Sequence, residues 1–223
     1  MKINATLQKL IVEFLGATLF LIALSGSISH SLAVPELAIA ATFGLALLIT
    51  SGISGGHLNP VVSLYFYSRN ALSLKEFFLY VLAQIGGAFF GTLIGLQLWG
   101  KAIRPLNIGS APDISVLLGE WVATGGLVFL FGFLVATKRA NLIPVTAALW
   151  IFSAASFTQS GAQANPAVSL ALILNGQGVT TSGWLIIAQL VGLVSGILGI
   201  MVFTAKPGKS KAKARAVKKA LKK

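Results

Sequence analysis

The sequence predicts an all-α membrane protein with six transmembrane helices plus two half-helices in an inverted repeat. Three observations predict this class. Only 10% of the 223 residues are charged and 56% are hydrophobic, with a mean hydropathy of +0.87, whereas a soluble domain carries about 25% charged residues. Long apolar runs recur along the chain, and an Asn-Pro motif occurs twice at corresponding positions of two similar halves.

The apolar runs are expected to be the transmembrane helices, because a bilayer core of about 30 Å needs about 20 helical residues. The first run could be mistaken for a signal peptide. It is long for one, contains Glu13, and has no small-residue cleavage site after it, so we interpret it as a transmembrane helix. The expected spans are residues 10–28, 37–51, 76–99, 114–137, 142–157 and 184–204, separated by polar turns of which 101–113 is the longest.

The half-helices are predicted at the duplicated motif. The string Ser-Gly-Gly-His-Leu-Asn-Pro-Val-Val-Ser-Leu at 54–64 recurs as Ser-Gly-Ala-Gln-Ala-Asn-Pro-Ala-Val-Ser-Leu at 160–170, with seven of eleven positions identical. In each copy the Asn suits a helix N-cap and the Pro suits the first helical position. About ten apolar residues follow, too few to span a bilayer. Short interrupted segments at matching positions of two halves indicate a transport site.

Further landmarks repeat at nearly the same offset. Glu13 matches Glu120, and Ala-Gln at 83–84 matches Ala-Gln at 188–189. Three spans per half make the second copy upside down relative to the first. The expected organisation is a first repeat at 1–106 with the half-helix at Asn59, and a second at 107–205 with the half-helix at Asn165. Together they form one pore domain, followed by a basic, disordered tail at 206–223.

The charge distribution predicts the orientation and excludes some partners. Nine of the 17 basic residues lie in 206–223, which indicates a cytoplasmic tail near anionic lipid headgroups rather than a nucleic-acid partner. Lys2, Lys9, Arg69, Lys75, Lys138 and Arg139 fall on the same side as this tail, and Lys101 and Arg104 fall on the other. The positive-inside rule therefore places both termini in the cytoplasm. The chain has no Cys, and its two His are far apart, so we expect no metal site and no cofactor.

The sequence resembles the aquaporin, or major intrinsic protein, family over nearly its whole length. The resemblance rests on the paired Asn-Pro boxes, one intramembrane Glu per half, and Ala-Gln-x-x-Gly in the third and sixth spans. Val61 replaces the usual Ala of the first box. The resemblance implies an aquaporin-like fold, passive conduction of water and small neutral solutes, and a homotetramer in the lipid bilayer with one pore per subunit.

The pore midplane is predicted where the two half-helices meet. Their N-termini carry partial positive charge, and Asn59 and Asn165 can turn amide donors toward a passing water. The midplane residues are Asn59, Pro60, Val61, Asn165, Pro166 and Ala167. The preceding strings are expected to lie extended and offer backbone carbonyls at Gly55, Gly56, His57, Leu58, Gly161, Gln163 and Ala164. The His57 side chain either gates the pore by protonation or only packs.

The resemblance also locates a constriction, where the family typically has an Arg three residues after the second Asn. Val168 occupies that position here. By spacing, the other constriction residues are Ile39 (or Phe43, one turn along), Ser153 and Ala162. With no cationic side chain among them, the mouth should be wide and pass glycerol-like solutes.

Two questions of role stay open. In resembling channels, acids such as Glu13 and Glu120 brace the loops before the boxes; a proton relay is the alternative. A secondary carrier, or a closed structural or junction protein, is the alternative to a channel. We find no catalytic constellation and expect no enzymatic activity.

Overall fold

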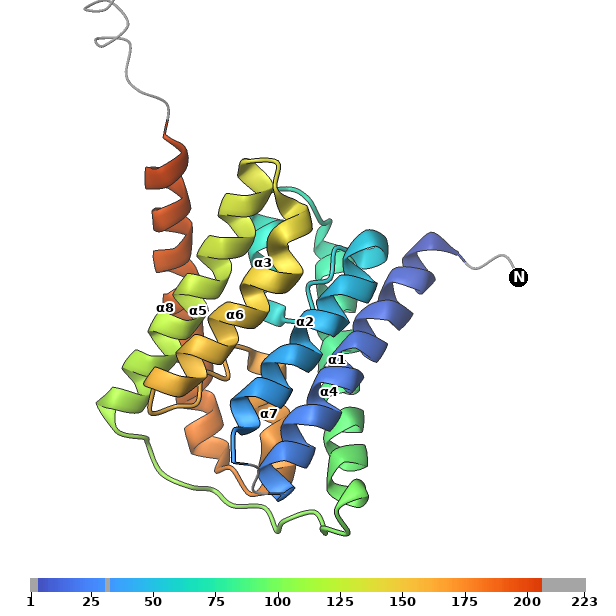
Figure 1. Cartoon of the computed structure of the whole chain (residues 1–223), viewed down its shortest axis with the longest axis vertical. Coiled ribbons are helices and arrows are strands. Elements are labelled where there is room, and N and C mark those ends of the chain that lie inside the picture. Colours follow the sequence, from blue (N-terminus) through green and yellow to red (C-terminus); the bar gives the residue numbers. More distant parts are fainter. Residues whose placement is uncertain (1–3, 31–32, 206–223) are drawn as a thin grey trace, which may run out of the picture.

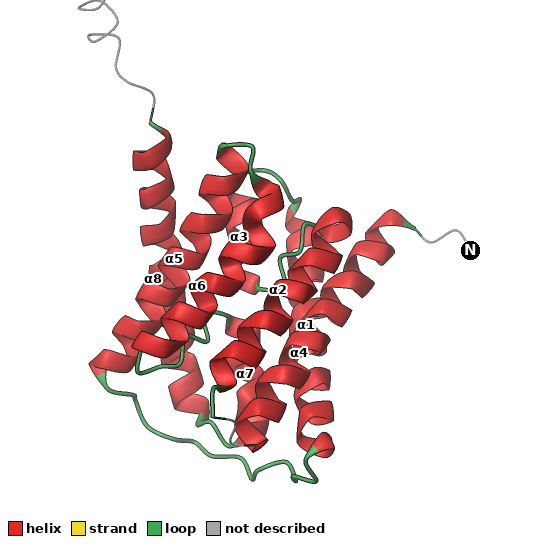
Figure 2. Ribbon diagram, in the orientation of Figure 1, coloured by secondary structure: helices red, strands yellow, loops and turns green. Residues whose placement is uncertain are grey.

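The computed structural model describes residues 4–30 and 33–205, and these fold into a bundle of helices joined by loops (Figures 1 and 2). Within this part of the chain, six helices are long and apolar enough to cross a membrane, so the predicted fold class is confirmed. They are α1 (Ala5–His30), α2 (Pro35–Ser54), α4 (Leu74–Leu98), α5 (Ile114–Ala136), α6 (Ile143–Phe157, after the 3-10 turn Ala140–Leu142) and α8 (Val179–Thr204). The short helices are α3 (Pro60–Ser68) and α7 (Pro166–Ala171), the latter continued by a 3-10 turn at Leu172–Asn175.

The second half of the chain repeats the helix order of the first in the opposite direction. α1 packs against α4 and α5 against α8, while α2 packs against α6 between the halves. α1 runs down and α5 runs up in the view of Figure 1. The start of α1 and the end of α8 therefore lie at the same end of the bundle.

Glycines allow the paired long helices to approach closely, as is typical of small residues at membrane-helix contacts. A Cβ built on Gly87 of α4 would lie 2.2 Å from the Phe14 carbonyl oxygen of α1. In α8, a Cβ on Gly192 or Gly196 would lie 2.7 Å from a carbonyl oxygen of α5. No larger residue fits at these three positions without separating the helices.

Two helices, α1 and α8, begin five residues earlier than the sequence predicts, each because its first turn finds hydrogen-bond partners. α1 begins at Ala5 because the Asn4 Oδ1 accepts from the backbone N–H of Thr6 at 2.9 Å, so Asn4 is an unrecognised N-cap. α8 begins at Val179, inside the predicted turn 175–183. There the N–H groups of the first two helical residues donate to the carbonyls of Asn107 and Ile108 at 2.9 and 2.8 Å.

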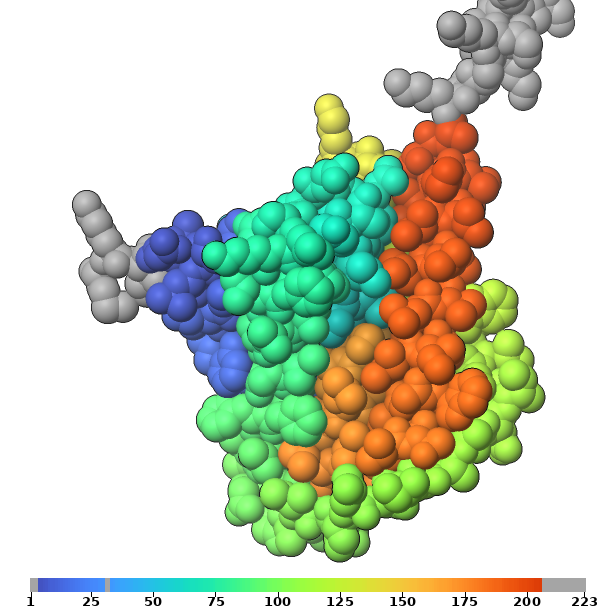
Figure 3. All heavy atoms as spheres, turned by 180° about the vertical axis from the view of Figure 1, so that it is seen from behind, coloured from blue at the N-terminus to red at the C-terminus, as the bar shows by residue number. Residues whose placement is uncertain are grey.

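The connection 101–113 runs across the end of the bundle opposite the start of α1 and the end of α8 (Figure 3). The Arg104 N–H donates to the Leu174 carbonyl at 3.0 Å, and the Thr181 hydroxyl donates to the Ser110 carbonyl at 2.9 Å. The expected boundary between residues 106 and 107 falls within this connection. The basic tail 206–223 lies outside the described residues.

Candidate functional site

The two half-helices begin as the duplicated motif predicts. Asn59 has extended backbone angles, and its side-chain oxygen accepts from the Val61 N–H at 2.9 Å. Asn165 does the same with the Ala167 N–H at 3.0 Å. Pro60 and Pro166 follow as the first helical residues, where the missing N–H costs no hydrogen bond.

The two caps also bind each other's loops, which joins the half-helices N-terminus to N-terminus inside the bundle. The Asn59 Nδ2 donates to the Ala164 carbonyl at 2.8 Å, and the Asn165 Nδ2 donates to the Leu58 carbonyl at 2.9 Å. Each amide nitrogen carries two hydrogens, so each Asn keeps one hydrogen with no partner among residues 4–30 and 33–205. Both side chains are buried.

The loops before the caps are not simply extended, which corrects the prediction made from the sequence. Leu58, Ala162 and Ala164 have φ of 50°, 53° and 48°, in the left-handed region that residues with a Cβ seldom adopt. Such strain persists only where surrounding contacts hold the backbone. The glycines with positive φ in the same loops are Gly55, Gly56 and Gly161.

Glu13 supplies the contacts that hold the first loop. Its Oε1 accepts from the His57 N–H at 2.9 Å and the Ser54 hydroxyl at 2.6 Å. Its Oε2 accepts from the Leu58 N–H and from the Gln84 side-chain amide, both at 2.7 Å. The carboxylate is fully buried, and four donors satisfy it as burial of a charge requires.

Glu120 makes the corresponding contacts in the second half. It accepts from the N–H groups of Gln163 and Ala164, both at 2.8 Å, and from the Gln189 amide at 2.6 Å. The same Gln189 nitrogen lies 2.9 Å from the hydroxyl of Ser169, as Gln84 lies 2.9 Å from the Ser63 hydroxyl. These are the contacts that the bracing hypothesis requires; the proton relay calls for no such pairing with loop N–H groups.

His57 packs inside the protein. Its ring stacks on Phe66 with centroids 4.5 Å apart, and its Nδ1 lies 3.1 Å from the Ser63 Oγ. The side chain is 4% exposed. Of the two roles predicted from the sequence, this environment favours packing over gating.

A cavity of about 310 Å³ lies at the end of the bundle where α1 ends and α2 begins. Ile39, Ala162 and Val168 line it, three of the four predicted constriction positions. Phe43 is buried and packs on Phe20 with ring centroids 4.9 Å apart, so Ile39 rather than Phe43 faces this cavity. The full lining is Phe20, Leu24, Ile28, Pro35, Glu36, Ile39, Ile151, Ala155, Ser160, Gly161, Ala162, Gln163, Val168, Leu172 and Gln177.

Ser153 is the exception, because it lies on the exposed surface of α6. Ile151 and Ala155 of the same helix line the cavity. The spacing from Asn165 was carried back through residues 158–164, which are not helical, so it could not predict which face of α6 points inward. The apolar period at Ala147, Ile151 and Ala154, all buried, is the signal that could have identified the inner face.

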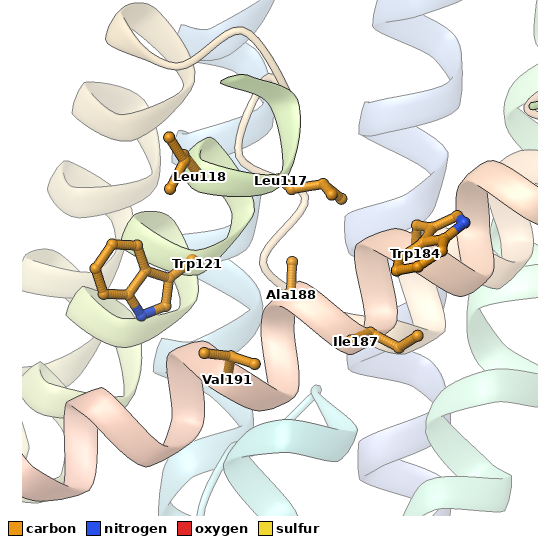
Figure 4. Close-up of a pocket in the computed structure, with 7 residues that line it drawn as sticks. All are labelled: Leu117, Leu118, Trp121, Trp184, Ile187, Ala188 and Val191. Atoms are coloured by element: carbon orange, nitrogen blue, oxygen red, sulfur yellow. The ribbon is translucent and has the colours of Figure 1, made fainter. Parts of the chain in front are cut away.

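Two other hollows lie on the outer surface between α5 and α8 and are separate from this site. Figure 4 shows one of them, formed entirely by apolar side chains: Leu117, Leu118, Trp121, Trp184, Ile187, Ala188 and Val191. Because both helices cross the membrane, we interpret this surface as facing lipid.

Comparison with known proteins identifies the family. A family model described as major intrinsic protein matches residues 1–156. The aquaglyceroporin AqpS of Rhizobium meliloti is 32% identical over 170 residues, covering 73% of this chain and 69% of that protein. The aquaporin NIP1-1 of Zea mays is 29% identical over 221 residues, covering 90% and 77%. The aquaglyceroporin structure from Plasmodium falciparum has the same fold, with a TM-score of 0.66 and 20% identity over 90% of this chain and 96% of that one. The chain therefore belongs to the major intrinsic protein family.

Proposed function

We propose that this protein is a passive channel for water and small uncharged solutes such as glycerol. The observation that carries the proposal is the reciprocal contact between the two capping asparagines and the opposite loops. It leaves one N–H on each of Asn59 and Asn165 for the oxygen of a passing molecule. The abutting helix N-termini add partial positive charge, so a cation meets repulsion where a neutral molecule finds donors.

The cavity lined by Ile39, Ala162 and Val168, called the outer cavity from here on, supports the proposal of a solute larger than water. Ile39, Ile151 and Val168 give it apolar walls, and none of its lining residues is Lys or Arg. The carbon skeleton of a solute can therefore contact the cavity wall without meeting a hydrated cationic side chain. Relatives of this chain include proteins named aquaglyceroporins, which accords with a mouth of this kind.

A channel also fits the site better than a carrier or an enzyme. A carrier needs polar groups that bind substrate or a coupling ion at the midplane, whereas the two asparagines already spend most of their hydrogen-bonding capacity on each other's loops. Members of this family are channels rather than enzymes.

We further propose the membrane organisation. Residues 1–106 and 107–205 form the two inverted repeats, which the opposite directions of α1 and α5 support. The connections containing Arg69 and Lys138 lie at the end where α1 starts, and the connection 101–113 lies at the other end (Figure 1). By the positive-inside rule, we propose that the end where α1 starts faces the cytoplasm. We also propose a homotetramer, as the family resemblance implies; native mass spectrometry of the detergent-solubilised protein should give four times the subunit mass.

Stopped-flow light scattering on proteoliposomes tests the proposed function. Protein-containing vesicles should shrink and reswell faster than protein-free vesicles in both water and glycerol gradients, with a low activation energy and no saturation. Fast water flux with no glycerol flux would refute the wide mouth. Saturable flux would indicate a carrier, and no flux of either would favour the structural role.

A further inference from the structure

The outer cavity has four polar or charged side chains among its lining residues, Glu36, Ser160, Gln163 and Gln177, and two of them, Gln163 and Gln177, are hydrogen-bonded to each other. The Gln163 Nε2 donates to the Gln177 Oε1 at 2.6 Å, and its Oε1 accepts from the Ser169 hydroxyl at 2.7 Å. The Gln177 Nε2 in turn donates to the Ser169 carbonyl and to the Ser182 hydroxyl, both at 2.9 Å. Both glutamines are half-buried and line the cavity.

The hydrogen-bond network determines which way the two amides point. The Ser169 carbonyl can only accept, so the nitrogen of Gln177 must face it. The oxygen of Gln177 then faces Gln163, and the nitrogen of Gln163 must face that oxygen. The positions of oxygen and nitrogen in both amides are therefore determined by the Ser169 carbonyl, and the flipped assignment is excluded.

Counting donors leaves one unused hydrogen in this pair. Both amide hydrogens of Gln177 have partners, whereas Gln163 uses only one of its two within residues 4–30 and 33–205. Gln177 Oε1 accepts one hydrogen bond from the described residues and has capacity for a second. Gln163 therefore keeps a donor and Gln177 an acceptor, and both residues belong to the cavity lining.

Among its described residues, the first half of the chain has no such pair, although its supporting contacts correspond. His57 occupies the position that corresponds to Gln163, and its ring is enclosed against Phe66 and Tyr80. The pairing of Gln163 with Gln177 thus belongs to the outer mouth alone and is not a requirement of the repeated scaffold.

We propose that Gln163 determines solute specificity at the outer mouth, in place of a cationic side chain. Its free N–H donates to a hydroxyl oxygen of a small polyol, and the Gln177 oxygen accepts from a neighbouring hydroxyl. The carbon skeleton packs on the apolar side chains of Ile39 and Ile151, which also line the cavity. This inference rests on the proposed channel function and assigns its preferred solute class, uncharged compounds with adjacent hydroxyl groups.

A polyol depends on this pair more than water does. Several hydroxyls lose their hydration together when a polyol enters, and each lost hydrogen bond needs a replacement on the wall. A water molecule is small enough to keep neighbouring waters as partners. Removing the donor should therefore lower glycerol permeability more than water permeability.

The variant Gln163→Met keeps the length of the side chain and removes the amide. Glycerol permeability of proteoliposomes, normalised to water permeability, should fall about 3- to 10-fold, the range expected for one lost hydrogen bond. Gln97→Met is the matched control, because Gln97 is exposed on α4 away from the cavity; its ratio should equal that of the wild type. An unchanged ratio in Gln163→Met would overturn the proposal.

Two further results separate the possible failures. If the amide only supported the fold, water and glycerol permeability would fall together and the ratio would stay constant, which would also overturn the proposal. Gln163→Glu gives a second comparison should the Met variant not fold, because a carboxylate still accepts from Ser169 but has no N–H; the same fall in ratio is expected. Wild-type vesicles that conduct neither solute would refute the proposed function itself.

Discussion

Replacing Glu13 by Gln tests whether the buried acids hold the strained loops. Each carboxylate oxygen receives two donors, so the new NH₂ group must face two of them in either orientation. If the NH₂ group faces Leu58 and Gln84, it meets two other donors, the Leu58 backbone N–H and the Gln84 side-chain NH₂. Facing His57 and Ser54 is less unfavourable, because the Ser54 hydroxyl can turn toward the Thr50 carbonyl 3.3 Å away.

The less unfavourable orientation, with the NH₂ group facing His57 and Ser54, still leaves the His57 N–H buried and unpaired. A lost hydrogen bond to a charged acceptor costs about 1.5–3 kcal/mol, and the remaining bonds weaken because their acceptor becomes neutral. We therefore expect Glu13→Gln to lower the free energy of unfolding by about 3 kcal/mol, measured by denaturant titration of the protein in detergent. Water flux per folded molecule should fall as well, because the loop carbonyls lose their fixed direction.

Glu76→Gln is the matched control. Glu76 lies in an exposed capping box, where it accepts from the Ser73 N–H at 2.9 Å, and a Gln side chain can serve the same box. Its effect should stay within about 0.5 kcal/mol. If Glu13→Gln is as stable as Glu76→Gln, the bracing role is refuted. Normal stability and water flux combined with a changed proton leak would instead support the relay.

The remaining predictions concern helix packing, the mouth and the caps. Gly87→Ala should cost about 3 kcal/mol or more of stability in the same titration, because its Cβ would lie 2.2 Å from the Phe14 carbonyl oxygen, whereas Gly86→Ala meets only an ordinary 3.5 Å contact and should be tolerated. Val168→Arg should lower glycerol permeability at least about 10-fold while water still passes, because a charged chain would fill the 310 Å³ cavity; unchanged glycerol flux would show that Val168 does not set the width. Asn165→Ala should lower the free energy of unfolding by about 1 kcal/mol through loss of the N-cap and should reduce water flux. Wild-type flux in this variant would show that the Asn165 side chain is not needed for conduction.

The caps of the two half-helices could be predicted from the sequence because their chemistry is local and duplicated. An Asn-Pro pair specifies a cap and a helix start within three residues, and a constant offset identifies Glu13 with Glu120 as partners of equivalent loops. The backbone conformation of those loops could not be predicted in the same way. The left-handed angles at Leu58 and Ala164 depend on carboxylates 43 to 45 positions away. No local sequence pattern can therefore predict them.

The constriction shows a different limit. Val168 follows Asn165 within one helix, where spacing determines the face. Counting from Asn59 to Ile39 crosses the irregular loop 55–58, so helical spacing does not explain why Ile39 lines the cavity. Ser153 was reached by counting through an irregular loop, and a two-residue change of register turns a helix by about 200°. That is the separation between Ser153 on the outer surface and Ile151 on the cavity wall.

The two halves differ most where the scaffold uses only the backbone. Glu13 and Glu120 bind N–H groups at positions 57 and 163, so neither contact depends on which side chain stands there. One position can therefore carry a His that packs against Phe66 and closes the space around it, and the other a Gln that lines an open cavity. A repeated scaffold that constrains backbone alone leaves its side chains available for specificity, which is why the departure from symmetry at Gln163 is the place to look for solute selection.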